Sequence, residues 1–413
     1  MKIAFFSDCF LDLTGGIVTS INTQKKALES LGHTVYVFSS SYPKSEQEKK
    51  RLRSQNIFPV PSCKVFFRGI VPIARRPKIV EKWLMANHPE IKDFDIFYIH
   101  YEGGCSIAGL RLGKELNIPT IQVMHGREDV GEANLVSFGF RTIVAFFLCW
   151  FHSWYLPHKT KVQRDNNLAD TVARAKMWAL MVNHANCADL VLTPSEHFRK
   201  KLIHFGLTSP SEVFPNGYPD AKYPESPKLK TVNPGETMRI IWHSRVSSEK
   251  RIMPFLKALT RVTGKYQLDV YGGGNHLAKA KRFARHHHLN AVFHGDISFK
   301  KIQSSIENAH LDVLVSYDFD TFGMTLIEAE AHGVPVLFCD PDMQEIVPKG
   351  SFVMSKNETE EAIADALNDL LSHPERIEKM SQVMLRHRNE VLMSKRIKQL
   401  EKIFESEIAK SKK

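Results

Sequence analysis

The N-terminal stretch KIAFFSDCFLDLTGGIVTSINTQKKALESLGHTVYVF, residues 2–38, decides the fold class. Its first six residues are a short apolar run, which is typical of a buried parallel strand. Gly15-Gly16 then interrupts the chain, apolar periodicity from Val18 to Leu31 predicts a helix, and residues 34–38 begin a second strand. Strands that alternate with helices in this way predict a mainly parallel sheet covered by helices on both faces.

The same alternation fills the rest of the chain in two series. The first series ends with strand-like runs at 96–99, 120–124 and 189–193, and a polar, turn-forming segment begins at Phe214. A second series starts at Met238, and the stretch 357–410 is typical of helix, with a break near His373-Pro374. We therefore predict an α/β protein with two doubly wound, Rossmann-like domains, residues 1–215 and 216–389, and a last helix at about 390–413 that packs back on the first domain.

Composition narrows the class of protein. With 413 residues, 43% apolar and 24% charged, the chain is typical of folded proteins and not of disordered or fibrous ones. Its start lacks the features of a signal peptide, and its six scattered cysteines form no CxxC pair, which favours a reducing cytosol over a zinc or disulfide framework. The net charge of +11 indicates an anionic partner: phosphate, nucleic acid or an acidic membrane. No nucleic-acid-binding motif accompanies it, so we expect no nucleic-acid partner.

The strongest local pattern is DTFGMTLIE, residues 320–328, which follows a buried strand and opens a helix. Such a helix start offers the backbone N–H groups of Gly323, Met324 and Thr325 to a phosphate. Glu328 can accept the hydroxyls of a ribose, and Asp320 those of a sugar. The alternative is that Asp320 or Thr321 only caps the helix and Glu328 is solvated.

Cations and glycines follow the neighbouring strands. Arg245 and Lys250 come after residues 238–242, where they can converge on one diphosphate. Gly273 lies in the glycine run 272–274 after another strand, which permits close approach of a ligand to the backbone. Each feature alone has a plain alternative, either a surface cation or a simple turn.

The first half offers different side chains. His125 and His100 each follow a strand and are expected at its carboxyl end, although a lone histidine there is more often structural. Residues 143–156 are strongly apolar and aromatic but too short to span a bilayer. Lys159 and Lys161 follow them, and Arg75-Arg76 lies beside two phenylalanines. Aromatic residues beside cations favour an anionic membrane surface, and a buried helix with solvated lysines is the alternative.

Taken in order, Arg245, Lys250, the glycines at 272–274 and residues 320–328 resemble the sugar-nucleotide site of the GT-B retaining glycosyltransferases of family 4. The resemblance implies two domains that face each other across a deep cleft, hexosyltransferase activity and no metal cofactor. The family usually has Glu where this chain has Asp320. The residues that it implies are, for catalysis, His125, Asp320, Arg245 and Lys250, and, for donor binding, Gly15, Gly16, Gly273, Phe293, Phe322, Gly323, Met324, Thr325 and Glu328.

Residues 8–20, 56–72 and 125–129 look like those of members that glucosylate diacylglycerol. This implies UDP-glucose as donor, a lipid acceptor and a peripheral position at the inner face of the cell membrane. The acceptor or membrane residues would be His100, Glu128, Asp129, Arg75, Arg76, Lys159 and Lys161. Three alternatives stay open: a cytosolic transferase acting on a polysaccharide precursor, sugar phosphate or small molecule, a metal-binding Asp-x-Asp at residues 318–320, and a non-enzymatic, basic nucleic-acid-binding protein.

Overall fold

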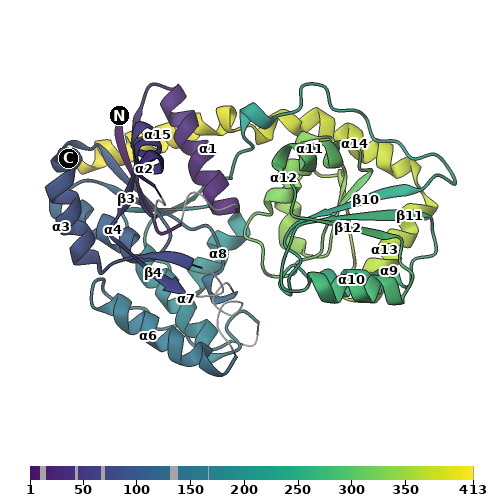
Figure 1. The fold of residues 1–413 in the computed structure, drawn as a ribbon, viewed down its shortest axis with the longest axis horizontal. Helices are drawn as coiled ribbons and strands as arrows, with labels where there is room; N and C mark the ends of the chain where they lie inside the picture. The colour runs from purple at the N-terminus through teal and green to yellow at the C-terminus, as the bar shows by residue number, and fades with distance from the viewer. Residues whose placement is uncertain (10–14, 42–44, 67–69, 131–137, 166, 413) are drawn as a thin grey trace. The chain divides into compact units, whose positions relative to one another are not determined.

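A computed structural model of the chain describes residues 1–9, 15–41, 45–66, 70–130, 138–165 and 167–412. It forms two compact units (Figure 1). The first consists of Met1–Pro215 together with Arg396–Lys413, and the second of Asn216–Lys395. Each unit contains its own parallel sheet, so the predicted α/β fold with two Rossmann-like domains is confirmed.

The first unit is built on a seven-stranded parallel sheet in the order β3-β2-β1-β6-β7-β8-β9. Its strands are β1 (Lys2–Ser7), β2 (Thr34–Ser40), β3 (Ile57–Val60), β6 (Ile96–His100), β7 (Thr120–Val123), β8 (Leu190–Thr193) and β9 (Ser211–Val213). A separate antiparallel hairpin, β4 (Ser62–Phe66) with β5 (Ile70–Ala74), was not predicted.

Both faces of this sheet are covered, because the side chains of β1 from Ile3 to Phe6 are apolar and buried on both sides. Ala4 and Phe6 pack into the cluster that includes α4, whereas Phe5 lies on the other face against Tyr98, which in turn contacts Phe404 of α15 at 5.1 Å between ring centroids. The helices are α1 (Gly16–Ser30), α2 (Glu46–Ser54), α3 (Pro77–Asn87), η1 (Pro89–Asp93), α4 (Gly104–Leu116), η2 (Phe138–Phe140), α6 (Arg141–Ser153), α7 (Val172–Ala185), α8 (Glu196–His204) and α15 (Met393–Ser411).

The second unit is built on a six-stranded parallel sheet in the order β12-β11-β10-β13-β14-β15. Its strands are β10 (Met238–His243), β11 (Tyr266–Tyr271), β12 (Ala291–Gly295), β13 (Leu311–Leu314), β14 (Val336–Phe338) and β15 (Phe352–Met354). Its helices are η3 (Asp220–Lys222), α9 (Ile252–Leu259), α10 (Leu277–His286), α11 (Phe299–Glu307), α12 (Met324–Ala331), η4 (Pro341–Glu345), α13 (Glu360–Ser372), α14 (Glu375–His387) and η5 (Arg388–Val391).

Side-chain alternation along β10 divides this second core into two layers. Ile240 and Trp242 pack with α9 and α13, and Ile241 packs on the opposite face with α11, α12 and α14. Figure 1 shows these helices on the two faces of the sheet. The strand order reverses between β10 and β13, and loops at such a reversal form the ligand site of open α/β sheets.

The helical tail has a second break that the sequence pattern did not predict. The first break, at His373-Pro374, separates α13 from α14 as expected. The second comes after α14, where Tyr218 N–H donates to Val391 O (2.7 Å) and Met393 N–H donates to Tyr218 O (2.9 Å). This pairing with a distant segment takes backbone groups that a continuous helix would use, so the helix ends there.

Candidate active site

Three loops of the second unit meet at the carboxyl ends of adjacent strands. Residues 244–251 follow β10, residues 272–276 follow β11, and residues 315–323 follow β13. Because β11, β10 and β13 are neighbours in a parallel sheet, the loops lie side by side at one edge. They contain the cations, the glycine turn and the acidic helix start that the sequence singled out.

Lys250 and Asp320, 70 residues apart in sequence, form an ion pair at this edge. The Nζ atom of Lys250 lies 2.6 Å from Oδ1 of Asp320, and each side chain is only 12% exposed. The other oxygen of Asp320 accepts a hydrogen bond from the hydroxyl of Ser316, and the ammonium lies 5.2 Å from the centre of the Phe319 ring. Two of the predicted catalytic residues are therefore brought into direct contact.

Helix α12 begins beside this pair with the features of an anion site. Gly323 precedes the helix in the left-handed region (φ +69°) and, as a glycine, has no side chain with which to cap the helix start. A Cβ atom at Gly323 would come within 3.1 Å of both Leu314 and Leu326, so the tight turn favours glycine. The hydroxyl of Thr325 is buried without a hydrogen-bond partner among the described residues. The backbone N–H groups and this hydroxyl suit the oxygens of a phosphate.

Glu328, one turn further along α12, is held by a histidine that the sequence analysis had not selected. Nδ1 of His243 lies 3.2 Å from Oε2 of Glu328, and Nε2 of His243 lies 2.8 Å from Oδ2 of Asp312. Burial alone would lower the pKa of His243, but the two carboxylates outweigh burial and raise it to about 10. His243 is therefore an imidazolium at neutral pH that orients Glu328. An aspartate inside the apolar strand Leu311–Leu314 was the available sequence signal, because a buried carboxylate needs a partner.

The raised pKa of His243 predicts a loss of stability on the alkaline side. A group whose pKa is higher in the folded state stabilises fully below its unfolded value, here 6.5, and loses that effect as pH rises to about 10. We expect the free energy of unfolding of the second unit to fall by on the order of 3 kcal/mol across this window. Urea titrations at pH 6, 8 and 10 can follow the ¹⁹F signal of 5-fluorotryptophan at Trp242, the one tryptophan of residues 216–395. The His243→Gln variant should lose most of the slope, and an equal slope in both proteins would contradict the assignment.

The glycine turn after β11 is shaped by close backbone approach. Gly272 has φ +123°, and a Cβ atom there would lie 2.3 Å from the carbonyl oxygen of Ser244. Gly273 donates its N–H to Oδ1 of Asp296 (2.7 Å), and its own carbonyl accepts the N–H of Val246 at 2.8 Å. These contacts fix the turn against the segment between β10 and Lys250, so any side chain at Gly272 would move that segment.

One predicted catalytic residue, Arg245, and two predicted donor-binding residues, Phe293 and Phe322, are placed differently. Arg245 has a side chain that is 65% exposed and lies 3.3 Å from Glu249. Phe293, in the middle of β12, packs against the hydrophobic core, and Phe322 is buried in a cluster with Tyr218 and Ile327. The structure thus gathers Lys250, Asp320, the start of α12 and Glu328, and it uses the two phenylalanines for packing.

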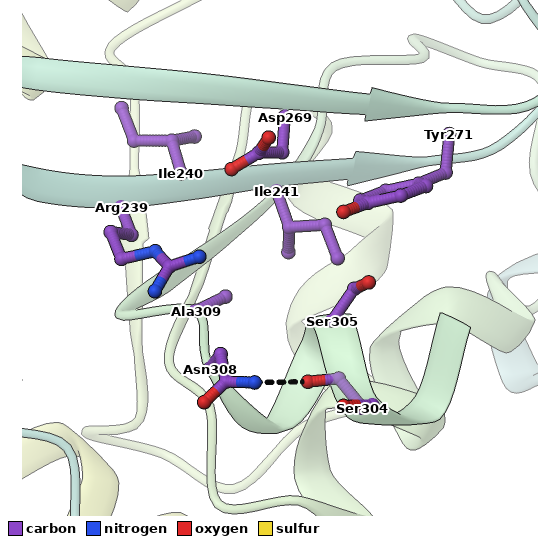
Figure 2. Close-up of a pocket in the computed structure, with 9 residues that line it drawn as sticks. All are labelled: Arg239, Ile240, Ile241, Asp269, Tyr271, Ser304, Ser305, Asn308 and Ala309. Carbon is purple, nitrogen blue, oxygen red and sulfur yellow. Dashed lines mark hydrogen bonds between the residues drawn. The ribbon is translucent and has the colours of Figure 1, made fainter. Parts of the chain in front are cut away.

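A small cavity of the second unit lies elsewhere, between β10, β11 and α11 (Figure 2). Its volume is about 80 Å³, which holds a few water molecules and not a nucleotide. The acidic group in its wall is Asp269, which is bonded to His294 at 2.8 Å. The cavity is lined by Arg239, Ile240, Ile241, Asp269, Tyr271, Ser304, Ser305, Asn308 and Ala309, none of which was predicted to bind the donor.

In the first unit, the two predicted histidines lie together at the ends of neighbouring strands. Nδ1 of His100, at the end of β6, lies 2.8 Å from Nε2 of His125, which follows β7. Burial lowers the pKa of His100 well below its ordinary value and lowers that of His125 to about 4, so both rings are neutral at physiological pH. Nε2 of His100 is buried without a hydrogen-bond partner among the described residues.

Acidic side chains follow these histidines closely in the sequence. Glu128 accepts a hydrogen bond from the hydroxyl of Tyr101 (3.0 Å), and burial raises its pKa to about 7. Burial and the charge of Glu128 also raise the pKa of Glu102 well above its usual range. Asp8, after β1, accepts hydrogen bonds from the backbone N–H groups at the start of α4 and from Ser106. Titratable groups with such shifts are typical of functional sites, although Asp8 also serves as a helix cap.

Asp129 is occupied by arginines of its own unit. Its two oxygens each lie 2.8 Å from the guanidinium of Arg127, and Oδ2 also lies 3.0 Å from Nε of Arg174 on α7. Arg127 in turn lies over the ring of Trp178 at 4.9 Å. Asp129 is 1% exposed, so its carboxylate is enclosed within the fold. It follows Glu128 in the sequence but has different hydrogen-bond partners.

The remaining predicted residues of the first unit lie on its surface. Gly15 and Gly16 are exposed at the start of α1, and residues 10–14, just before them, lie outside the described residues. The cations Arg75, Arg76, Lys159 and Lys161 are all exposed.

Helix α6 exposes a continuous apolar face. Its outward side chains, spaced three and four residues apart as on one side of a helix, are Phe140, Ile143, Phe147, Trp150 and Trp154, with exposed fractions from 49% to 64%. The opposite side packs along α7 through Ala145 and Leu148 (Figure 1). The ammonium of Lys176 lies 4.5 Å over the ring of Phe146 beside this face. The helices in the described parts of the chain include none that is both long and apolar enough to cross a bilayer.

Comparison with known proteins identifies both halves. Residues 14–222 match the model of Glycosyltransferase Family 4, and residues 228–384 match that of Glycosyl transferases group 1. The chain is 23% identical over 360 residues to an alpha-monoglucosyldiacylglycerol synthase of Streptococcus pneumoniae, covering 82% of this chain and 70% of the relative. It is 26% identical over 163 residues to a lipopolysaccharide 1,6-galactosyltransferase of Escherichia coli, covering 38% and 44%. The fold resembles Anabaena HepE in complex with UDP, with a TM-score of 0.68, 14% identity and coverage of 98% and 100%.

Proposed function

The chain belongs to the GT-B glycosyltransferases whose two halves are the family 4 and group 1 domains, and on this premise we propose that it transfers glucose from UDP-glucose, with retention of configuration, to the hydroxyl of a membrane lipid such as diacylglycerol. The observation that carries the donor half of the proposal is the contact between Lys250 and Asp320 beside the start of α12. A lipid acceptor is supported by the named relative and by the exposed aromatic face of α6.

In this proposal the second unit binds the diphosphate of the donor. The N–H groups of Gly323, Met324 and Thr325 and the hydroxyl of Thr325 face the phosphate oxygens, and Lys250 supplies the positive charge. Glu328, oriented by His243, accepts the ribose hydroxyls. One oxygen of Asp320 accepts a hydrogen bond from a hydroxyl of the sugar, while the other contacts Lys250. The same ion pair therefore binds both the sugar and the diphosphate.

The reaction breaks the bond between C1 of the sugar and the diphosphate oxygen and forms a bond between C1 and the acceptor oxygen on the same face. The acceptor proton passes to the departing phosphate. Lys250 and the start of α12 stabilise the charge that develops on that phosphate, an electrostatic contribution that is large in a buried site. His125, neutral because of burial, accepts or donates one hydrogen bond near the reacting sugar without adding charge.

Acceptor binding is proposed for the first unit. Glu128 has a pKa of about 7 and a fixed bond to Tyr101, so it can accept a hydrogen bond from an acceptor hydroxyl. Its neighbour Glu102 carries a raised pKa for the same reason of burial. A glycerol hydroxyl of a lipid fits such a group.

We propose that α6 rests on an anionic membrane. Its aromatic face supplies apolar area for the interfacial region, and Lys159, Lys161 and Lys176 lie in the adjoining segments to meet lipid phosphates. Peripheral attachment at the inner face of the cell membrane agrees with the free thiols of all six cysteines, which suit a reducing compartment.

A donor screen by thermal unfolding tests the proposed donor site. Among UDP-, GDP- and ADP-glucose, UDP-glucose is expected to raise Tm most, because stabilisation follows affinity for the folded state. The rise should persist in excess EDTA, since Lys250 and the start of α12 supply the charge that a metal would otherwise provide. A shift that disappears with EDTA would favour the Asp-x-Asp metal alternative, and a preference for GDP- or ADP-glucose would overturn the assigned donor.

A further inference from the structure

Three buried or half-buried histidines of the first unit form one hydrogen-bonded row. Nε2 of His158 lies 2.7 Å from Nδ1 of His152 on α6, and Nε2 of His152 lies 2.9 Å from Nδ1 of His184 on α7. Nε2 of His184 then lies 3.1 Å from Oε1 of Gln122 on β7. The row thus runs from the surface, through two helices, to the central sheet.

The orientation of the Gln122 amide determines the tautomer of each histidine in the row. Its amide nitrogen donates to the carbonyl oxygens of Tyr101 (3.1 Å) and Val123 (3.2 Å), so its oxygen must accept from His184. An amide turned the other way would place its oxygen against two carbonyl oxygens. His184 consequently carries its proton on Nε2 and accepts on Nδ1, and the same logic places the protons of His152 and His158 on Nε2.

All N–H groups of the row therefore point from the surface toward the sheet. A second proton on His152 or His184 would remove the acceptor that its neighbour needs, so both rings are held neutral by their bonds. Burial acts in the same direction, because it lowers the pKa of His152 well below its ordinary value and that of His184 to about 3.

The inner end of the row is a backbone position that is rare for a side chain other than glycine. Tyr101 has φ +101°, and the amide of Gln122 is bonded to its carbonyl oxygen. Such a conformation persists only where surrounding bonds hold it. The hydroxyl of the same tyrosine donates to Glu128 (3.0 Å), the proposed acceptor-binding carboxylate.

We infer that the row His158–His152–His184, acting through Gln122, is a positioning device that fixes Tyr101 and thereby Glu128 relative to the aromatic helix α6. His152 lies on the inner side of α6, opposite the apolar face. The row therefore fixes the position of Glu128, which binds the acceptor, relative to α6, which contacts the lipid. The inference rests on the proposed function for its effect on acceptor binding, but the geometry of the row can be tested without activity.

The first arm of the test is ¹⁵N NMR of the full chain labelled at histidine. Long-range ¹H–¹⁵N spectra between pH 6 and 8 should show the Nε2–H tautomer for His152, His158 and His184, with no titration of His152 or His184. Assignment uses the single variants His152→Gln, His158→Gln and His184→Gln. An Nδ1–H tautomer at His152 or His184, or an imidazolium at either in this range, would overturn the inference.

The second arm compares His184→Phe, which keeps a ring but no hydrogen bond, with His184→Gln, which can both donate and accept. In His184→Phe, the amide signals of Tyr101 and Glu128 should shift and the KM for lipid acceptor should rise roughly tenfold, because buried partners lose their bonds. The donor KM should stay unchanged, and His184→Gln should restore both readouts. His204→Phe, an exposed histidine of α8, is the control.

The outcomes separate the two proposals. Unmoved Tyr101 and Glu128 signals, or a donor KM that rises with the acceptor KM, would overturn the positioning role. If His184→Phe does not fold, His152→Phe, nearer the surface, replaces it with the same expected pattern. If the wild type shows the expected tautomers and His184→Phe shifts the Tyr101 signal, but the wild type transfers no glucose to lipid, the proposed function is contradicted and the row stays as inferred.

Discussion

The Lys250→Ala variant is expected to lower kcat/KM for glucosyl transfer about 10²- to 10³-fold, the cost of removing one preorganised charge or donor at the leaving group. The side chain of Lys250 is only 12% exposed and its Nζ lies 2.6 Å from Asp320, so its charge acts in a shielded site where water replaces it poorly. Initial rates at varied UDP-glucose, with lipid acceptor in vesicles, measure the effect.

The control for this variant is Lys257→Ala in the same unit. Lys257 belongs to α9, is 50% exposed and pairs with Glu360, so its removal should leave kcat/KM within about twofold of wild type, as a surface ion pair contributes little. The alanine variant leaves Asp320 without its cation, so Lys250→Gln is measured beside it. The glutamine amide can still donate a hydrogen bond to Asp320 but carries no charge, so the activity of this variant should also be strongly reduced. Near-full activity in both Lys250 variants would remove this residue from the site.

Replacing Ile143, Phe147 and Trp150 together by serine is expected to weaken binding to anionic vesicles roughly 100-fold. Each side chain exposes about half or more of its area, so its transfer into the interface contributes on the order of 1 kcal/mol, and three together contribute ~3 kcal/mol. Sedimentation with vesicles that contain phosphatidylglycerol, at several lipid concentrations, gives the partition coefficients.

A matched control is Ile203→Ser, an exposed isoleucine of α8 in the same unit, which should bind vesicles as the wild type does. The packing side of α6 is untouched in the triple variant, so its circular dichroism and Tm should stay close to wild type. Equal vesicle binding by the triple variant would show that α6 is not the lipid-contacting face. A wild-type chain that is dimeric in gel filtration, with a monomeric triple variant, would instead assign the face to self-association.

The fold could be predicted from the sequence because its signals are local. Mainly apolar runs such as residues 2–7 and 311–315 are typical of strands buried on both faces, and the glycines and prolines between the runs mark the turns. The hairpin β4–β5 and the break at residues 388–392 could not be predicted in this way. The break depends on Tyr218, more than 170 residues earlier in the chain, which takes the backbone groups that would continue the helix.

The candidate site could be predicted from the sequence for those residues whose place depends only on which strand they follow. Lys250, Asp320 and the start of α12 follow neighbouring strands, so parallel topology brings them to one edge. His243 escaped the pattern because its role depends on Asp312, a partner 69 residues away that looks like an ordinary strand residue. Phe322 lies in the same motif but packs in the core, because an apolar side chain beside a glycine turn serves the packing of α12.

The anomeric configuration of the product tests the central claim most directly. The chain is incubated with ¹³C-labelled UDP-glucose and diacylglycerol in anionic vesicles, and the lipid extract is analysed by NMR. The account predicts glucosyl-diacylglycerol with an α linkage, the configuration that glucose has in the donor, and the same product in excess EDTA. A β-linked product would contradict retention, and glucose transferred only to soluble acceptors would contradict the membrane lipid as substrate.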